Sequence, residues 1–250
     1  MKFRCERDAL VEQLGTASRA VSSRGGALPV LTGIHLKAHK DTLTMTGSDL
    51  EITVRASVAV DVKKSGEAVL PSRIVVDIIR SLDSGAVEVE VSGEEAKISG
   101  GRSQFSVRTL PVDDFPALSD PSGDQVTVAT ADLAAGLKQV VRAASGDDAR
   151  PILTGVLMSA EDGGLRLVAT DSYRLAVRDL PEATVLSEGQ KVLVPSRALD
   201  ELSRVLGDSE EVNVRLGERE VSFDVSIEDG AVQVTTRLME GEFPNYRQLI

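Results

Sequence analysis

The chain has no tryptophan, and phenylalanine and tyrosine make up only 3% of its 250 residues. Proteins that bind single-stranded nucleic acid without sequence preference stack its bases on aromatic rings, so this composition argues against that class. Reading base edges requires Asn, Gln and Arg clustered on a recognition helix, and no segment has that character. Any contact with DNA should therefore be made through phosphates, without sequence preference.

Cysteine and histidine are scarce. The one cysteine, Cys5, cannot form an internal disulfide bond, and we expect a buried, inert thiol. His35 and His39 are four residues apart on an expected strand, which separates them by roughly 13 Å, too far to share a metal ion. The glycine pair Gly25-Gly26 ends a helix instead of opening one around a phosphate. We predict a protein that is not an enzyme and that needs no cofactor or metal.

Long apolar runs are also missing, so no segment can span a bilayer. The N-terminal segment, Met1–Arg7, is charged and lacks the apolar region of a secretory signal. A net charge of −11 repels anionic membranes and nucleic acid alike. These features predict a cytoplasmic protein without membrane partners, in which any DNA contact comes from a local basic patch.

The most informative feature that is present is an internal repeat. The segment Leu28–Leu36 (LPVLTGIHL) returns 122 residues later as Arg150–Met158 (RPILTGVLM). Three more pairs follow in the same order at offsets of 122 to 128: Ser48-Asp49 with Thr170-Asp171, Val69–Arg73 with Leu193–Arg197, and Phe115-Pro116 with Phe243-Pro244. Several anchors at a nearly constant offset indicate a duplicated domain. We predict modules at 1–120 and 125–250, joined by a polar hinge.

Each copy has the pattern strand, helix, three strands, then again strand, helix, three strands. Alternating apolar and polar residues, as in Glu51–Val60, are typical of half-buried strands. Asp8 is expected to cap the first helix, and Pro71 and Pro195 to stand in the first turns of later ones. The four helices are expected at Asp8–Ser22, Pro71–Leu82, Ala131–Ala144 and Pro195–Leu206. The predicted fold class is α+β, with two helices packed on antiparallel sheets in each module.

Positive charge is concentrated on these helices. Arg73 and Arg80 are seven residues apart, and Arg197 and Arg204 repeat that spacing in the second copy. Lys138 and Arg142, four apart, share one stripe of a third helix. The segments 6–24, 71–82, 131–145 and 195–206 carry net charges of 0, +1, +1 and 0, or +2 together. Because the whole chain carries −11, the rest of the chain carries −13. Two interpretations stay open: ordinary solvated helix faces, or surfaces that follow DNA phosphates.

Several motifs together resemble the bacterial sliding clamp family, the beta subunit of DNA polymerase III, over all 250 residues. They are Leu28-Pro-Val-Leu31, Gly47-Ser-Asp-Leu-Glu51, Pro71-Ser-Arg73, Thr109-Leu-Pro111, Asp114-Phe-Pro116, Ala169-Thr-Asp171, Tyr173-Arg-Leu-Ala176 and Gly241–Arg247. The resemblance implies a DNA-clamp fold with three modules per chain. It also implies a head-to-tail homodimeric ring that encircles duplex DNA, with helices lining the hole, and tethers the polymerase during processive synthesis.

The resemblance assigns two sets of residues. The residues expected to contact DNA are Arg24, Arg73, Arg80, Lys138, Arg142, Arg150, Arg197 and Arg204. Of these, Lys138 and Arg142 come from the helix pattern above, and the resemblance implies the other six. A cleft that receives short peptide motifs from the polymerase III catalytic subunit, the clamp loader and other clamp-motif proteins is expected at Leu153, Thr170, Ser172, Tyr173, Arg174, Leu175, Pro244 and Leu249. The chain departs from some relatives in that Ser172-Tyr173 replaces glycine-histidine and Pro151-Ile152 replaces an aromatic pair.

The distances after the last repeat suggest a longer protein. Gln125 begins the second module ten residues after Phe115, whereas only seven residues follow Phe243. We therefore expect the first two of three modules, with the third supplying the other wall of the cleft and contacting the edge near Arg102–Arg108. The alternative to a DNA tether is a fragment that binds clamp-binding motifs without encircling DNA.

Overall fold

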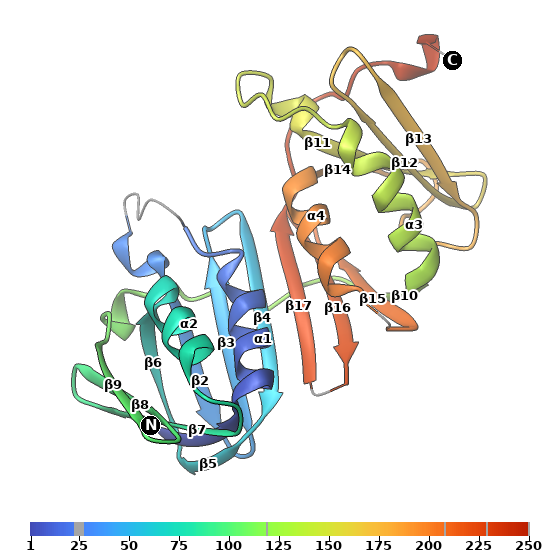
Figure 1. Ribbon diagram of the computed structural model, residues 1–250. Coiled ribbons are helices and arrows are strands. Elements are labelled where there is room, and N and C mark those ends of the chain that lie inside the picture. The colour runs from blue at the N-terminus through green and yellow to red at the C-terminus, as the bar shows by residue number, and fades with distance from the viewer. Residues whose placement is uncertain (23–27, 119, 208, 229, 250) are drawn as a thin grey trace. The chain divides into compact units, whose positions relative to one another are not determined.

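The computed structural model describes residues 1–22, 28–118, 120–207, 209–228 and 230–249 (Figure 1). The chain forms two compact units, Met1–Ser119 with Ile227–Gln233, and Asp120–Ser226 with Val234–Ile250. Each unit combines antiparallel strands with two α-helices, which confirms the predicted α+β class. Within the described ranges, no helix has both the length and the apolarity that crossing a membrane requires.

The first unit is built from two sheets and two helices. One sheet has the order β5-β1-β7-β8-β9, and β4-β3-β2-β6 are neighbours in another. Both short 3₁₀ segments, η1 (Pro29–Thr32) and η2 (Val112–Asp114), lie in connections. The other elements are β1 (Lys2–Glu6), α1 (Arg7–Ser18), β2 (Gly33–His39), β3 (Thr42–Ser48), β4 (Ile52–Ala59), β5 (Asp61–Lys64), β6 (Gly66–Pro71), α2 (Ser72–Ser81), β7 (Ala86–Ser92), β8 (Glu95–Gly100) and β9 (Ser103–Arg108).

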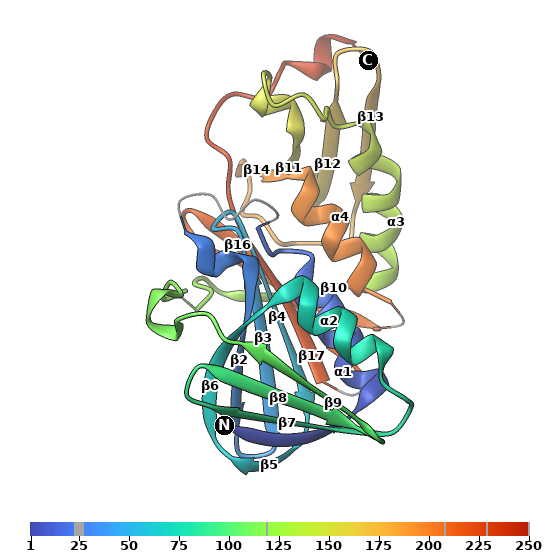
Figure 2. The same ribbon diagram turned by 60° about the vertical axis from the view of Figure 1, so that its left-hand side comes forward.

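Helices α1 and α2 lie side by side and contact each other in the first unit (Figures 1 and 2). They bury Leu10 and Leu14 from α1 and Val75 and Ile79 from α2, each at most 1% exposed, in one apolar core. Burying such a side chain stabilises the fold by roughly 1.5–3 kcal/mol. Cys5 is buried in the same core, as expected.

The second unit repeats this plan. Its strands form the order β13-β12-β11-β14, and β10-β15-β16-β17 are neighbours in another sheet. Helices α3 and α4 contact each other and lie side by side (Figures 1 and 2). The elements are β10 (Gln125–Ala129), α3 (Thr130–Val140), η3 (Val141–Ala143), η4 (Pro151–Thr154), β11 (Gly155–Glu161), β12 (Gly164–Thr170), β13 (Leu175–Leu180), β14 (Lys191–Pro195), α4 (Ser196–Val205), β15 (Glu211–Leu216), β16 (Glu220–Ile227), β17 (Gly230–Arg237) and η5 (Tyr246–Leu249).

The sequence repeat corresponds to a structural one. Gly33 and Gly155 begin equivalent strands, each directly after an equivalent 3₁₀ turn. Both glycines are required by close packing, because an added Cβ would lie 2.6 Å from Val69 Cγ1 in the first unit and 2.8 Å from Leu193 Cδ1 in the second. Pro71 and Pro195 each end a strand immediately before a helix, so the two helix starts are equivalent, as predicted.

Several local expectations were wrong. Asp8 lies in the first turn of α1, and Glu6 is the N-cap residue, because β1 runs directly into the helix. That helix ends at Ser18, not Ser22, and the glycine pair Gly25-Gly26, expected to end it, lies outside the described residues. Pro71 and Pro195 precede their helices as N-cap residues instead of standing in the first turn. Helix α3 ends at Val140, which places Arg142 in the 3₁₀ segment that follows, so the α-helical stripe predicted for Lys138 and Arg142 does not continue to Arg142. The strand expected at Glu51–Val60 is β4, which runs from Ile52 to Ala59.

Candidate functional site

The sheet β13-β12-β11-β14 presents two different faces, because successive side chains of a strand point to opposite sides. One face packs against the helices: a Cβ on Gly136 of α3 would lie 3.1 Å from Leu167 Cδ1 of β12. The opposite face, called here the outer face, carries an apolar cluster that includes Leu157, Val168, Leu175, Val177 and Leu193. The helices cover only the first face, so the outer face is available to another chain segment.

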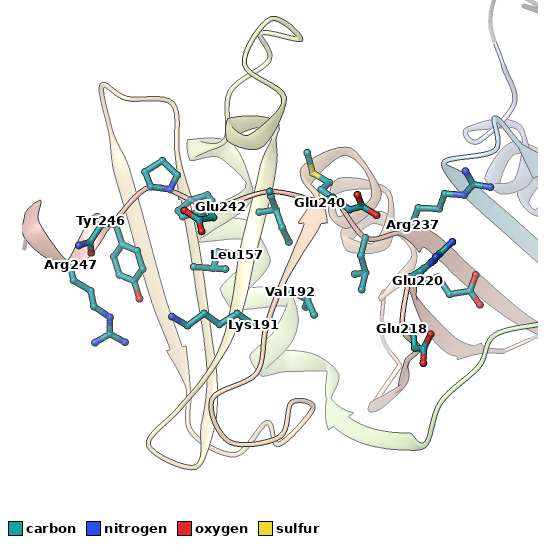
Figure 3. A pocket seen from close by; sticks show the side chains of 18 residues that line it. Leu157, Lys191, Val192, Glu218, Glu220, Arg237, Glu240, Glu242, Tyr246 and Arg247 are labelled. Atoms are coloured by element: carbon teal, nitrogen blue, oxygen red, sulfur yellow. The ribbon is translucent and has the colours of Figure 1, made fainter.

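That segment is residues 239–249, called here the exit segment. Met239 forms an isolated bridge to Leu193, and Phe243 and Tyr246 pack on the apolar cluster. Tyr246 is 5% exposed, so its ring is part of the core of this face. A groove of about 1010 Å³ runs along the exit segment between β11, β14 and residues 218–220. Figure 3 shows Leu157, Lys191 and Val192 on its floor and Tyr246 and Arg247 at one end.

Charged residues connect the exit segment to the same face. Arg166 on β12 donates from Nε and Nη2 to both carboxylate oxygens of Asp179 on β13, at 2.6 and 2.9 Å. Its Nη1 lies 3.7 Å from Glu161 Oε2 on β11, and Arg247 donates to Glu161 Oε1. The hydrogen bond from Arg247 holds the pKa of Glu161 below its ordinary value, and the bond from Arg166 does the same for Asp179. Hydrogen bonds to Asp179 and to the Tyr246 side chain raise the pKa of Arg166.

The first unit has polar residues where the second has this apolar cluster. The paired residues Leu157 and Val168 correspond in register to His35 and Thr46. Likewise Val177, which pairs with Val168, corresponds to Arg55, which pairs with Thr46. Leu175 corresponds in the same way to Thr53. At these positions the outer face is apolar in the second unit and polar in the first. At Leu193 the corresponding residue, Val69, is also apolar, and it is buried in a cluster against which Leu110 and Phe115 pack.

In the first unit, His35 and Arg55 make contacts with other residues of that unit. The His35 ring stacks on Phe115 with centroids 5.1 Å apart, and its Nε2 lies 3.2 Å from Glu67 Oε2. Burial lowers the pKa of His35, although the Glu67 carboxylate opposes this shift. Arg55 Nη2 donates to the carbonyl oxygen of Leu118 at 3.0 Å. Among the described residues, no group of three His, Cys, Asp or Glu side chains is arranged to hold a metal ion.

Two residues of the predicted cleft lie at the outer face or its groove. Leu175 is half-buried in the apolar cluster, and Pro244 lines the groove. Leu153 is buried just before β11, and Arg174 is exposed and paired with Asp171 at 2.9 Å. Leu249 belongs to η5, but its side chain lies outside the described residues. The sequence prediction missed Leu157, Val168, Val177, Phe243 and Tyr246, which comparison of the two copies position by position could have found.

Thr170 and Asp171 build a tight turn that shapes the loop beside Leu175. Thr170 Oγ1 donates to the Arg174 carbonyl at 2.8 Å and accepts from the Ser172 amide at 3.1 Å. Asp171 Oδ1 accepts from the amides of Tyr173 and Arg174 at 2.9 and 3.0 Å. Tyr173 is 93% exposed at the tip of the loop. The Thr-Asp pair therefore fixes the loop, which leaves Tyr173 accessible.

Ser172 has a φ of 79° in this turn, a conformation that costs a non-glycine residue roughly 1–2 kcal/mol. We expect Ser172→Gly to raise the free energy of unfolding of the second unit by about 0.5–1 kcal/mol, because the greater entropy of unfolded glycine offsets part of the gain. Chemical denaturation measures it. Ser226→Gly, at an exposed position of strand β16, is the control and should destabilise. Equal effects from the two substitutions would show that the turn stores no strain.

Four of the eight basic residues assigned to DNA lie on exposed surfaces of α2 and α4. Arg73 and Arg80 are exposed on α2, and Arg197 and Arg204 are exposed on α4. Arg204 pairs with Asp200 at 2.7 Å, so part of its charge is balanced. The remaining four are divided: Lys138 and Arg142 are exposed, Arg150 pairs with Asp147 at 3.0 Å, and Arg24 lies outside the described residues.

Comparison with known proteins agrees with the repeat. Residues 1–119 match the N-terminal domain, and residues 127–245 the central domain, of the DNA polymerase III beta subunit. The beta sliding clamp of Streptomyces coelicolor is 35% identical over 257 residues, which cover 100% of this chain and 66% of that protein. The beta sliding clamp of Micrococcus luteus is 34% identical over 252 residues, covering 100% of this chain and 80% of that protein.

Solved structures show the same similarity. A sliding clamp from Pseudomonas aeruginosa, crystallised with griselimycin, matches with a TM-score of 0.90 at 31% identity and covers 100% of this chain and 68% of that one. Duplicated α+β modules with paired helices define the protein as one with the DNA-clamp fold. The chain belongs to the beta sliding clamp family, the beta subunits of DNA polymerase III, and spans about two thirds of the length of the Streptomyces coelicolor relative.

Proposed function

We propose that this chain forms two modules of a cytoplasmic sliding clamp, a non-catalytic processivity factor that encircles duplex DNA and tethers a replicative polymerase. The observation that carries the proposal is the matched pair of exposed arginines on α2 and on α4, at Arg73 and Arg80 and at Arg197 and Arg204. Such stripes contact phosphates and carry no base specificity, which suits a protein that slides. The net charge of −11 keeps the rest of the surface from binding DNA.

The outer face of the second unit supports a second part of the proposal, a peptide site at Leu175 and Pro244. Peptide sites of this kind combine an apolar floor with a few polar groups, and here Leu157, Val168 and Val177 supply further apolar surface. The occupants are hydrophobic motifs of the polymerase III catalytic subunit, the clamp loader and other clamp-motif proteins. Polar residues at the corresponding positions of the first unit favour a site in the second.

Topology distinguishes this function from simple DNA binding. A chain completed with the third module of a full-length relative should form a homodimeric ring. Once loaded on nicked circular DNA by a clamp loader, it should stay bound through gel filtration and leave when the circle is cut. Equal retention on circular and linear DNA would contradict encirclement. Peptide binding without any retention on DNA would favour the alternative, a module that only binds clamp-binding motifs.

A further inference from the structure

The position of the exit segment decides the shape of the proposed peptide site, because Pro244 lies on it. The apolar contacts of Phe243 and Tyr246 hold the segment against the sheet, but apolar contact is not directional. At its start the segment makes a directional backbone bond, from the Met239 amide to the Leu193 carbonyl at 2.8 Å, and near Pro244 directional bonds come from the ion pairs. Arg166 bonds Asp179 in a two-pronged arrangement and approaches Glu161, and Glu161 accepts from Arg247, three residues after Pro244.

Two of the four charged side chains are shielded, whereas Asp179 and Arg247 are 56% and 55% exposed. The side chains of Glu161 and Arg166 are 16% and 21% exposed. Ser159 Oγ, at 3.3 Å, also donates to Glu161 Oε1 and fixes the carboxylate further. Charge-assisted hydrogen bonds are short and geometrically specific. The register of the exit segment on the outer face is therefore fixed by charge as well as by burial.

The repeat provides an internal comparison. Glu161 of β11 corresponds to His39 of β2, as the pairs Glu161↔Gly164 and His39↔Thr42 show. The cross-strand pair Arg166↔Asp179 corresponds to the uncharged pair Thr44↔Ser57. These three charges therefore occur in the same copy as the apolar outer face and are absent from corresponding positions of the other. Their joint occurrence links the charges to the peptide site.

We propose that Glu161, Arg166, Asp179 and Arg247 form a clasp that positions the exit segment, and with it Pro244, for peptide binding; this rests on the proposed peptide site. They are positioning residues, since the peptide contacts the wall that they hold and not the clasp itself. Opening the clasp should misplace the wall and weaken peptide binding, while the buried core of the second unit remains folded.

The test uses the 250-residue chain and the synthetic peptide acetyl-Gln-Ala-Ala-Leu-Phe, titrated to millimolar concentration and followed by nuclear magnetic resonance. Glu161→Gln and Arg247→Gln should each lower the affinity about three- to tenfold, as expected when a preformed site loses its arrangement. Arg215→Gln is the control, because Arg215 also forms a half-buried ion pair in this unit, 3.1 Å from Asp224. It should leave the peptide affinity unchanged.

A conservative variant separates positioning from general stability. Arg247→Lys should keep the affinity within about twofold of the unmodified chain, because a lysine ammonium can still pair with the Glu161 carboxylate. Wild-type affinity in both single variants, or binding by Arg247→Lys as weak as by Arg247→Gln, overturns the clasp. If the unmodified chain does not bind the peptide at all, the proposed peptide site fails for this chain. Amide exchange over 239–247 then decides the clasp, and exchange unchanged by Arg247→Gln overturns it.

Discussion

Replacing Arg73 and Arg197 by alanine should markedly weaken retention of the three-module protein on duplex DNA. Both side chains are exposed at the second position of equivalent helices, α2 and α4. Each lost phosphate contact removes about 0.9 from the slope of log affinity against log salt, so the double variant should lose about two units per chain. At 0.15 M salt we expect DNA retention at least about tenfold weaker. Fluorescence anisotropy over a salt series measures both quantities.

The control removes the same charge from other surfaces. Lys63 and Lys191 are both exposed and lie on strands β5 and β14. Their double alanine variant should keep the slope of the unmodified protein. If both double variants behave alike, net charge decides binding. If neither changes it, the helix arginines are solvated faces with no role at DNA, the other interpretation that the sequence left open.

Leu175→Asp should abolish peptide binding to the second unit. Leu175 is half-buried at the edge of the apolar cluster, so a carboxylate there would need to be desolvated under a hydrophobic ligand. The two-module chain should bind a peptide ending in two hydrophobic residues only weakly, on the order of hundreds of micromolar, since one anchoring side chain contributes roughly 1.5–3 kcal/mol. Calorimetry and nuclear magnetic resonance measure these affinities.

The graded variant Leu175→Thr introduces the residue type that the first unit has at the corresponding position, Thr53. It should retain a fraction of the binding and leave thermal unfolding nearly unchanged. Loss of the folded state in Leu175→Asp would show that Leu175 belongs to the core and not to a binding surface. Sub-micromolar binding by the unmodified two-module chain would contradict the account in which a third module supplies the second wall.

Much of the apolar outer face lies outside the residues that the sequence predicted for the cleft. The family motifs around Thr170 and Pro244 predicted residues in the loop after β12 and in the exit segment. Much of the apolar surface, however, comes from alternate residues inside strands. Thr170 itself is 7% exposed, with its hydroxyl engaged in the turn. The motifs located the region of the candidate site, but the strand register decided which side chains point to the outer face.

The amino-acid sequence by itself determined the duplication, the α+β class and the order of the elements except β5 (Asp61–Lys64), a strand that it did not predict. Those properties depend on local periodicity and on a repeat offset, which are read directly along the chain. It also identified the helices that carry Arg73 and Arg197, because helical spacing alone places residues on a shared stripe.

Only the tertiary structure decided how the outer face of the second unit is built. Leu157, Leu175 and Tyr246 are far apart in the chain, and pairing of β11 with β12 and of β12 with β13, followed by the return of the exit segment, makes them one surface. Contacts between Glu161 and Arg247 depend on the same return. Such contacts cannot be read from local pattern, because register and packing fix them and neither is encoded within any single segment.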